Sequence, residues 1–316
     1  MKLSSISFVA PAYNERESLP ELIAELHDVG KTLGLPYEII IVDDGSRDGT
    51  ANFLETTAVA DARLHPIILH RNLGKASALA TAFQRARGAA IVTLDADLQN
   101  DPNEIPKLLE QLGPAADIVS GWKFDRPDGL EKRAASRLFN SVTRWVTGLP
   151  LHDFNSGIKA YTREAAQRLE LSGELHRYIP VLADSLGYRI TEVQTHTRPR
   201  KYGETKYKGK RYVRGFFDLL TVVFLTKYVR RPLHFFGGLG LTLGLVGGAM
   251  LVYLAVIRLF GGQPIGTRPL LTFGIFFVLV GLQLVMTGLL AELLTRAVGQ
   301  KFPPIRAEWN GHGDLA

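Results

Sequence analysis

The sequence predicts an open, mostly parallel α/β sheet followed by a hairpin of two membrane-spanning helices. Short apolar runs alternate with helical segments over residues 5–122, which is the pattern of a parallel sheet with crossover helices. Acidic residues follow several of these runs. Two long stretches near the C-terminus contain no Asp, Glu, Lys or Arg.

The elements of the sheet domain can be assigned in order. We expect strands over Ser5–Ala10, Tyr37–Val42, 64–70, 89–97 and 116–122, because these runs are short and apolar. Helical apolar spacing predicts helices over 17–34, 74–87 and 103–112, the second ending at Gly88. Ligands of such sheets bind beyond the carboxyl ends of the strands, so the residues that follow each strand are the candidates for function.

The pattern loosens in the next part of the chain. Residues 131–148 predict a basic amphipathic helix. Residues 152–169 predict a loop, a short strand and a helix, and residues 187–200 a late strand that runs into a basic loop.

Two apolar segments predict membrane spans. Leu233–Ile257 and Leu270–Ala291 contain 25 and 22 residues without Asp, Glu, Lys or Arg, and a spanning helix needs about 20. The alternative is a pair of buried core helices, but soluble helices rarely run so long without a charge. Gly240, Gly244 and Gly248 form a small-residue face suited to helix pairing in lipid, and we expect a homo-oligomer formed through these helices.

The charge distribution favours a membrane partner. Between Arg198 and Arg231, eleven Lys and Arg residues stand against Glu204 and Asp218, whereas the formal charge of the whole chain is only +6. A basic block beside apolar segments indicates an anionic membrane surface. Nucleic acid is not expected, because the chain lacks the interleaved aromatic and basic residues of a binding module. The positive-inside rule places the basic block and both ends of the chain in the cytoplasm. The chain has no cysteine, which excludes disulfides and thiolate metal sites.

The stretch "LDADLQN" places two carboxylates one residue apart at the end of an expected strand. Asp95 and Asp97 repel one another unless a cation neutralises them, and Mg²⁺ and Mn²⁺ prefer oxygen ligands and often bridge to phosphates. Gln99 adds an amide oxygen close by. An Asp-rich turn at the start of a helix would give the same pattern, so this motif alone leaves both interpretations open.

Further motifs give the metal interpretation a context. "PAYNE", "VDDGSRDGT" and "LDAD" follow three expected strands, in an order that resembles the nucleotide-sugar pocket of family 2 glycosyltransferases with the GT-A fold, over residues 5–210. "HRNLGKASAL", "LDADLQNDP", "HDFNSGIKAY" and "RPRKYGETKY", followed by two apolar segments, are similar to motifs of the dolichyl- and polyprenyl-phosphate glycosyltransferases.

This resemblance implies roles for individual residues. The nucleoside would be held by Pro11, Tyr13, Glu15, Val42 and Asp44. The diphosphate would lie at Asp95, Ala96, Asp97, Leu98 and Gln99, with Asp97 and Gln99 as metal ligands. Asp95, Asp97 and Asp153 would be the catalytic residues, with Asp153 facing the sugar, although a turn-capping role is the alternative for Asp153.

Basic residues would bind the phosphates. The resemblance implies that Lys123 contacts the donor, where the family often has an Arg; a Lys keeps the charge but loses the bidentate fork. The expected ligands of the acceptor phosphate are Arg137, Ser141, Arg177, Arg200 and Lys206. For each basic residue the alternative is a charge that faces solvent or lipid headgroups.

The resemblance also implies an activity and a layout. The expected reaction is an inverting transfer of a hexose from GDP-mannose or UDP-glucose to polyprenyl or dolichyl phosphate, with Mg²⁺ or Mn²⁺. The chain would be an integral membrane protein with a cytoplasmic catalytic domain. We expect that domain over 1–210, a basic juxtamembrane segment over 211–231, spans over 232–258 and 269–295, and a cytoplasmic tail over 296–316.

Two other functions compete with this one. A processive polysaccharide synthase would carry a Gln-x-x-Arg-Trp motif, but Arg144-Trp145 is preceded by Val142 and, where the Gln would stand, by Ser141. A membrane-anchored nucleotide-binding protein without catalysis would be expected to lose a metal ligand. Asp95, Asp97 and Gln99 are all present, which favours the enzyme.

Overall fold

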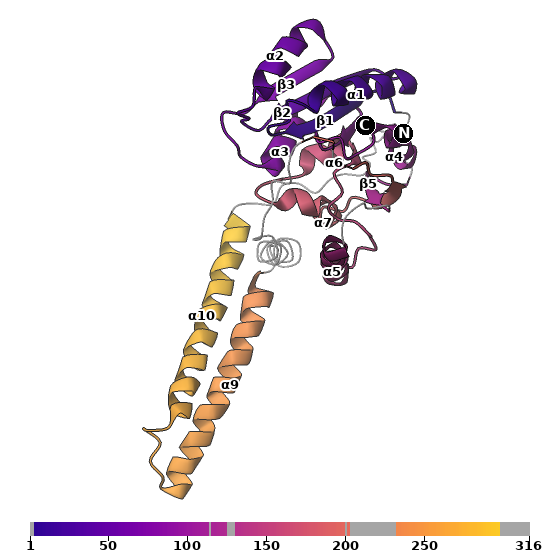
Figure 1. The fold of residues 1–316 in the computed structure, drawn as a ribbon. Coiled ribbons are helices and arrows are strands. Elements are labelled where there is room, and N and C mark those ends of the chain that lie inside the picture. The colour runs from indigo at the N-terminus through magenta and orange to yellow at the C-terminus, as the bar shows by residue number, and fades with distance from the viewer. Residues whose placement is uncertain (1–2, 114, 125–129, 200, 203–231, 298–316) are drawn as a thin grey trace, which may run out of the picture. The chain divides into compact units, whose positions relative to one another are not determined.

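The computed structural model describes residues 3–113, 115–124, 130–199, 201–202 and 232–297 (Figure 1). The chain divides into two units, Met1–Val222 and Val223–Ala316. The expected juxtamembrane segment and nearly all of the expected tail lie outside the described residues.

The N-terminal unit is built on a seven-stranded sheet with the order β3-β2-β1-β4-β6-β5-β7. Its strands are β1 (Ile6–Ala12), β2 (Tyr37–Asp43), β3 (Leu64–Ile68), β4 (Ala90–Thr93), β5 (Ile118–Lys123), β6 (Lys159–Thr162) and β7 (Ile190–Thr195). Strand β6 runs antiparallel to β4 and β5, and every other pair is parallel. The expectation of a mostly parallel sheet is therefore confirmed.

Strand β6 has a consequence for the edge where ligands are expected. The parallel strands end at this edge, but β6 begins there, because Lys159 pairs with Thr93 of β4 and Ser120 of β5. The first residue of β6 thus lies among the carboxyl ends of its neighbours. A side chain from the segment 152–159 can reach the same site as the residues that follow β4.

Helices cover both faces of the sheet (Figure 1). Helix α1 (Leu19–Leu33) and helix α4 (Ile105–Gln111) pack on one face in a core that includes Phe8 and Ile39. The opposite core is covered by α3 (Lys75–Arg85), α6 (Arg163–Arg168) and α7 (Ile179–Ser185). The central strands are apolar on both faces for this reason.

The remaining helices of this unit are α2 (Thr50–Ala60), η1 (Pro102–Glu104), α5 (Leu130–Thr147) and η2 (Leu175–Tyr178). Helix α2 and the segment η2–α7 were not predicted from the sequence. Only Thr50 and Leu54 of α2 are buried. Its sequence therefore lacks the regular spacing of apolar residues from which a helix can be predicted. The expected strand 89–97 ends at Thr93, and the rest of it forms the loop that carries Asp95 and Asp97.

The C-terminal unit consists of α9 (Pro232–Gly261) and α10 (Pro269–Ala297), which run side by side in opposite directions (Figure 1). Both are long and apolar enough to cross a membrane, and only 17% of the most apolar window of each is buried. This low burial argues against the alternative of two soluble core helices, whose apolar residues would be covered by protein.

Glycines set the contact between the two helices. A Cβ at Gly281 would lie 2.6 Å from the Gly240 carbonyl oxygen and 2.8 Å from the Gly244 nitrogen, and one at Gly247 would lie 2.6 Å from the Gly274 carbonyl oxygen. The backbones therefore approach as closely as small residues permit. Gly244 and Gly248 were also expected in this face, but a Cβ added at either would meet no atom within 4 Å. The Gly244 backbone still contacts Gly281, whereas Gly247 takes the place of Gly248.

Candidate functional site

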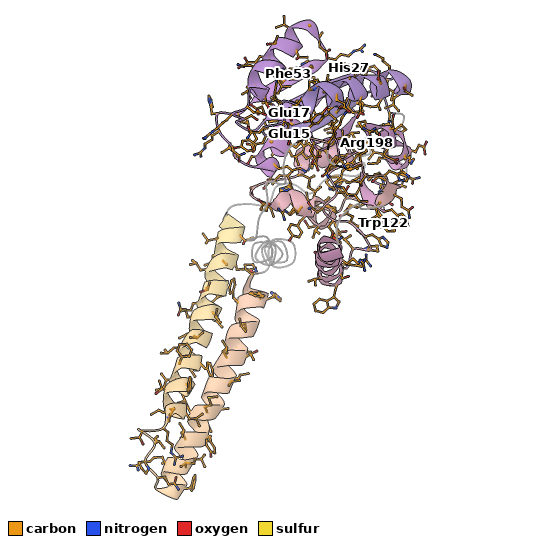
Figure 2. All side chains as sticks on the ribbon, viewed as in Figure 1. Glu15, Glu17, His27, Phe53, Trp122 and Arg198 are labelled. Carbon is orange, nitrogen blue, oxygen red and sulfur yellow. The ribbon has the colours of Figure 1, made fainter. Side chains whose placement is uncertain are left out.

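The loops after β1 and β2 are tied together at the carboxyl edge of the sheet. The Asn14 backbone N–H donates to the Ser46 hydroxyl (2.8 Å), and the Asn14 side-chain oxygen accepts from the Arg47 N–H (2.8 Å). Glu15 donates its N–H to the Thr50 hydroxyl (3.2 Å) and accepts from the Ser18 hydroxyl (3.0 Å). Figure 2 shows Glu15 on this part of the domain.

Four of the expected nucleoside residues differ in their burial and contacts. Asp44 is buried, and its two oxygens accept from the backbone N–H groups of Leu73 (2.7 Å) and Gly74 (2.9 Å), so it also shapes the loop before α3. Val42 is fully buried in the core, whereas Tyr13 is partly exposed; so is Pro11, a further member of the expected set. The Val42 side chain therefore serves packing, and a contact of Asp44, Tyr13 or Pro11 with a nucleoside stays a prediction.

Asp95 is held by lysines. Its carboxylate forms an ion pair with Lys75 at the start of α3. Burial alone raises the pKa of Asp95, but the ammonium groups of Lys75, Lys123 and Lys159 oppose this effect and lower the pKa to about 2. A Cβ at Gly157 would collide with the Asp95 carboxylate, so only glycine leaves room for it. Asp95 is therefore a fixed, ionised group.

The next turn presents Asp97 and Gln99. The Asp97 carboxylate accepts from the Gln99 backbone N–H (3.2 Å), and Leu98 between them has a φ of 61° in the left-handed region. A buried, β-carbon-bearing residue in this region is strained, and such strain is often found at functional sites. The Leu98 side chain, 3% exposed, fixes the turn in the core.

The donor set of this turn fits a hard divalent cation. Asp95 is already neutralised by Lys75, which leaves the partly exposed Asp97 carboxylate and the Gln99 amide as oxygen ligands. No cluster of three or more His, Asp or Glu side chains within the described residues could form a complete protein cage. Mg²⁺ and Mn²⁺ sites commonly combine one or two carboxylates with substrate phosphates, so two protein ligands are sufficient.

A segment after β7 holds the acidic loop from outside. The Arg198 N–H donates to the Gln99 carbonyl (2.9 Å), and the Arg198 guanidinium binds Glu25 of α1 (2.6 Å) and Asp101 (2.8 Å). Residues Asn100 and Thr197 form an isolated antiparallel bridge. Figure 2 shows Arg198 on the sheet domain. The segment 197–199 is called the strap below.

The loop before β6 brings Asp153 and Lys159 to the site. Asp153 is buried and accepts from the Asn155 N–H (3.2 Å), so it caps a turn, which was the alternative to its expected sugar contact. Lys159 is 2% exposed and donates to the Ser156 carbonyl. Burial lowers the pKa of Lys159 to about 7, and Lys75 adds to this, whereas Asp153 and Asp95 oppose it.

The structure brings together only part of the expected basic set. Lys123 ends β5, and its positive charge helps to lower the pKa of Asp95. Arg137 and Ser141 are exposed on α5, four residues apart on one face. Arg177 lies on η2 and pairs with Glu174 (2.9 Å). Arg200 and Lys206 lie outside the described residues.

Sequence reasoning missed several residues of the site. Lys75 and Lys159 belong to motifs that were recognised, "HRNLGKASAL" and "HDFNSGIKAY", but had no role assigned. His176, Gly157 and Arg198 were not singled out. The only available signal for Lys159 was an apolar strand that begins with a lysine, and its meaning depends on the direction of β6.

Comparisons with known proteins agree with this geometry. Residues 7–170 match the model of the family described as "Glycosyl transferase family 2". The chain is 38% identical over 304 residues to the undecaprenyl-phosphate 4-deoxy-4-formamido-L-arabinose transferase of Pseudomonas fluorescens, covering 96% of this chain and 86% of the relative. It is 36% identical over 296 residues to the dodecaprenyl-phosphate galacturonate synthase of Rhizobium johnstonii, covering 92% and 88%.

Solved structures support the fold. Glucosyl-3-phosphoglycerate synthase from Mycobacterium tuberculosis, in complex with Mn²⁺, UDP and phosphoglyceric acid, superposes with a TM-score of 0.55 at 23% identity. The match covers 70% of this chain and 78% of that one. The sheet domain thus has the GT-A fold, and the expectation from the sequence is confirmed. With its family model, its relatives and its fold in agreement, the chain belongs to glycosyltransferase family 2.

Proposed function

We propose that this glycosyltransferase moves a glycosyl group from a nucleotide sugar to a polyprenyl phosphate at the membrane. The observation that carries the proposal is the loop Asp95–Gln99, whose oxygen ligands and neighbouring lysines lie together at the carboxyl edge of the sheet. The relatives named for undecaprenyl and dodecaprenyl phosphate support the acceptor, and the two apolar helices support a membrane location.

The residues of the site suit this reaction. A lipid monophosphate has a second pKa of about 6, so it is largely ionised at neutral pH and needs little help from a general base. The main task is to bring two anions together, for which Lys123, Arg137 and Arg177 are proposed partners. Direct attack on the anomeric carbon would invert its configuration. Asp153 would then orient the sugar and would not be required as a base.

Asp97 and Gln99 would hold Mg²⁺ or Mn²⁺. When bound, the ion neutralises charge on the leaving nucleoside diphosphate. The Mn²⁺ in the complex of the mycobacterial synthase supports a divalent ion here. Glu15, Asp44 and Tyr13 would hold the nucleoside, and the half-buried Pro11 would support it.

The transferred sugar is less narrowly defined. The resemblance suggests a hexose from GDP-mannose or UDP-glucose. The relatives are named for a formamidoarabinose, which is a pentose with a formyl group, and for galacturonate, which carries a carboxylate. The proposal therefore covers nucleotide sugars as a class, and the choice of donor requires a panel.

The proposed topology places the sheet domain and both ends of the chain on the cytoplasmic side. A hairpin of two spans returns the chain to its starting side, and the basic residues before Pro232 favour the cytoplasm. Nucleotide sugars are made in the cytoplasm of a cell, so this side gives the site access to its donor.

Transfer of radiolabelled sugar into a lipid extract tests the function. Purified full-length protein is incubated with polyprenyl phosphate and each of several labelled nucleotide sugars, with Mn²⁺ or with EDTA. We expect one donor to label the lipid, Asp97→Asn and EDTA to abolish labelling, and the exposed Asp28→Asn to have no effect. No labelling from any donor would contradict the function, and full labelling in EDTA would contradict the role of the metal.

A further inference from the structure

A small pocket lies beside Asp95 on the face of the sheet that α3 and α7 cover. Its polar lining comes from Lys75 of α3, Thr93 of β4, Asn155 and Ser156 of the loop before β6, Lys159 and Tyr161 of β6, and His176 of η2. Thr93 and Lys159 are partners in the antiparallel pairing of β4 and β6. The pocket therefore lies at the carboxyl edge of β4, next to the carboxylate assigned to the nucleotide sugar.

Two groups in this lining lack a partner within the described residues. The Tyr161 hydroxyl is fully buried without a hydrogen-bond partner of good geometry, and it interacts only weakly with the neighbouring Thr93 hydroxyl, which donates to the Gly157 carbonyl (3.3 Å). Burial raises the pKa of Tyr161, so its hydroxyl stays protonated and is available as a donor. Nδ1 of His176 is also buried without a partner. A buried polar group without a partner is costly, which indicates that something else completes the set.

The charge of the pocket favours a hydrogen-bond acceptor as its occupant. Lys159 donates to the Ser156 carbonyl, and its ammonium carries two further N–H groups. Lys75 is paired with Asp95, and Lys159 faces both Asp95 and Asp153. The other charges that act on the lining are Lys123 and the pair Arg177–Glu174. With Lys159 protonated, the pocket is therefore surrounded by one more positive charge than negative charges. Burial, together with Lys75, lowers the pKa of His176 to about 3, so its ring is neutral.

We propose that this pocket binds a carbonyl-type oxygen on the transferred sugar, that is, a carboxylate or an acylamino group. The inference rests on the proposed function and narrows its substrate class. The hydroxyl of Tyr161 and the ammonium of Lys159 donate to that oxygen, and a sugar with only hydroxyl groups at this position leaves them poorly paired. A site built to hydrogen-bond one group discriminates strongly against an analogue that lacks it.

The test measures donor binding without the lipid acceptor. Full-length protein in detergent with Mn²⁺ is titrated calorimetrically with matched pairs: UDP-glucose with UDP-glucuronate, and GDP-mannose with GDP-mannuronate. UDP-N-acetylglucosamine provides the acylamino arm, and UDP and GDP alone report the nucleotide. We expect the carbonyl-bearing sugar of the recognised nucleotide to bind about ten- to a hundred-fold more tightly than its plain hexose, as a charged hydrogen bond allows.

Two variants assign the effect to the pocket. Tyr161→Phe removes one hydroxyl and keeps the ring that packs on Phe83, and Lys159→Met keeps the length of the side chain without its charge. Each should reduce the preference about tenfold when the affinity of each variant for the sugars is compared with its own affinity for the free nucleotide. Tyr188→Phe is the matched control, because this buried tyrosine pairs with Glu164 (3.4 Å) and does not line the pocket.

The outcomes separate this inference from the proposed function. Equal binding of plain and carbonyl-bearing sugars by the wild type overturns the inference, and a bound water then completes the pocket. A preference that survives both variants overturns it as well. A preference without transfer to polyprenyl phosphate upholds the pocket and contradicts the acceptor. Transfer to polyprenyl phosphate without a preference supports the proposed function and contradicts the pocket. If no nucleotide sugar binds at all, the pocket and the proposed function are both overturned.

Discussion

Lys159 is a cation buried in a place where hydration cannot stabilise it. The charged form loses its water on folding, and only part of that loss is recovered from the Ser156 carbonyl and the nearby carboxylates of Asp95 and Asp153. Such a group lowers the stability of the fold and is kept for what it does at the site. The cost depends on pH, which makes it measurable.

The free energy of unfolding should rise with pH in two windows. Lys159 has a folded pKa of about 7 against 10.5 for an ordinary lysine, so the unfolded chain binds more protons between those values and loses that advantage as the pH rises. His176, with a folded pKa of about 3 against 6.5 for an ordinary histidine, acts in the same direction between those values. A tenfold change in a proton-binding constant on folding corresponds to about 1.4 kcal/mol.

Lys159→Met should therefore remove most of the upper slope and leave the lower one. Unfolding of the sheet domain, followed by tryptophan fluorescence of full-length protein in detergent at pH 7 and 9.5, gives the measurement. The exposed Lys31→Met is the control and should retain the wild-type slope. An unchanged slope in Lys159→Met would show that Lys159 is not desolvated in the folded protein.

At the scale of elements, the strap links the acidic loop to α1. Arg198 joins three parts of the chain through the Gln99 carbonyl, Asp101 and Glu25. The side chains of these residues are only partly exposed, so the bridge is less screened by solvent than an ordinary surface pair. Arg200 and Lys206, which are proposed to bind the acceptor, follow the strap in the sequence.

Arg198→Ala should weaken Mn²⁺-dependent binding of nucleoside diphosphate by about 10–100-fold, the usual effect of removing a residue that orients a metal ligand. Calorimetry with Mn²⁺ and diphosphate measures this directly. Saturating metal should restore much of kcat, because Arg198 positions the loop and touches no reacting atom.

The matched control lies at the other end of β7. Arg189 forms a similar bridge to Asp117 (3.1 Å) and the Gly113 carbonyl (3.2 Å), beside the strand starts and away from the site. Arg189→Ala should lower stability and leave metal affinity unchanged. Equal loss of affinity in both variants would assign the effect of Arg198 to general destabilisation.

The elements also show which features a sequence can reveal. Strands β1, β2 and β4 and the motifs that follow them were predicted, because local periodicity and strand-end chemistry are readable within a few residues. The direction of β6 was not, since it depends on pairing between Thr93 and Lys159, which are far apart in sequence. The ion pair of Lys75 with Asp95 and the buried, poorly paired Tyr161 hydroxyl could not be predicted for the same reason, because both depend on residues far apart in the sequence.

At the scale of the whole molecule, the chain combines a GT-A domain with a helical hairpin whose contact is set by glycine. Gly240 of α9 meets Gly281 of α10, and Gly247 of α9 meets Gly274 of α10. The two glycines of each helix are seven positions apart in the sequence. In lipid there is little hydrophobic drive between helices, so close backbone packing supplies most of the association.

Gly281→Leu should therefore destabilise the hairpin, because its Cβ would lie 2.6 Å from a backbone oxygen that cannot move aside. Gly248→Leu, where no atom lies within 4 Å, should be tolerated. The midpoint of thermal aggregation in detergent, measured by size-exclusion chromatography, compares the two. Equal midpoints would mean that the two helices do not pack through this face in the isolated protein.

The length of these helices has a consequence for the bilayer. At 1.5 Å per residue, the uncharged stretch of 25 residues in α9 is about 37 Å long, against about 30 Å of hydrocarbon in an average membrane. The hydrophobic mismatch of about 7 Å is relieved when the helices tilt or when the surrounding lipids stretch. Because α9 and α10 are joined by backbone contact over their length, they must tilt together. A change in bilayer thickness should therefore change the tilt of the two helices together, as if the hairpin were one rigid unit.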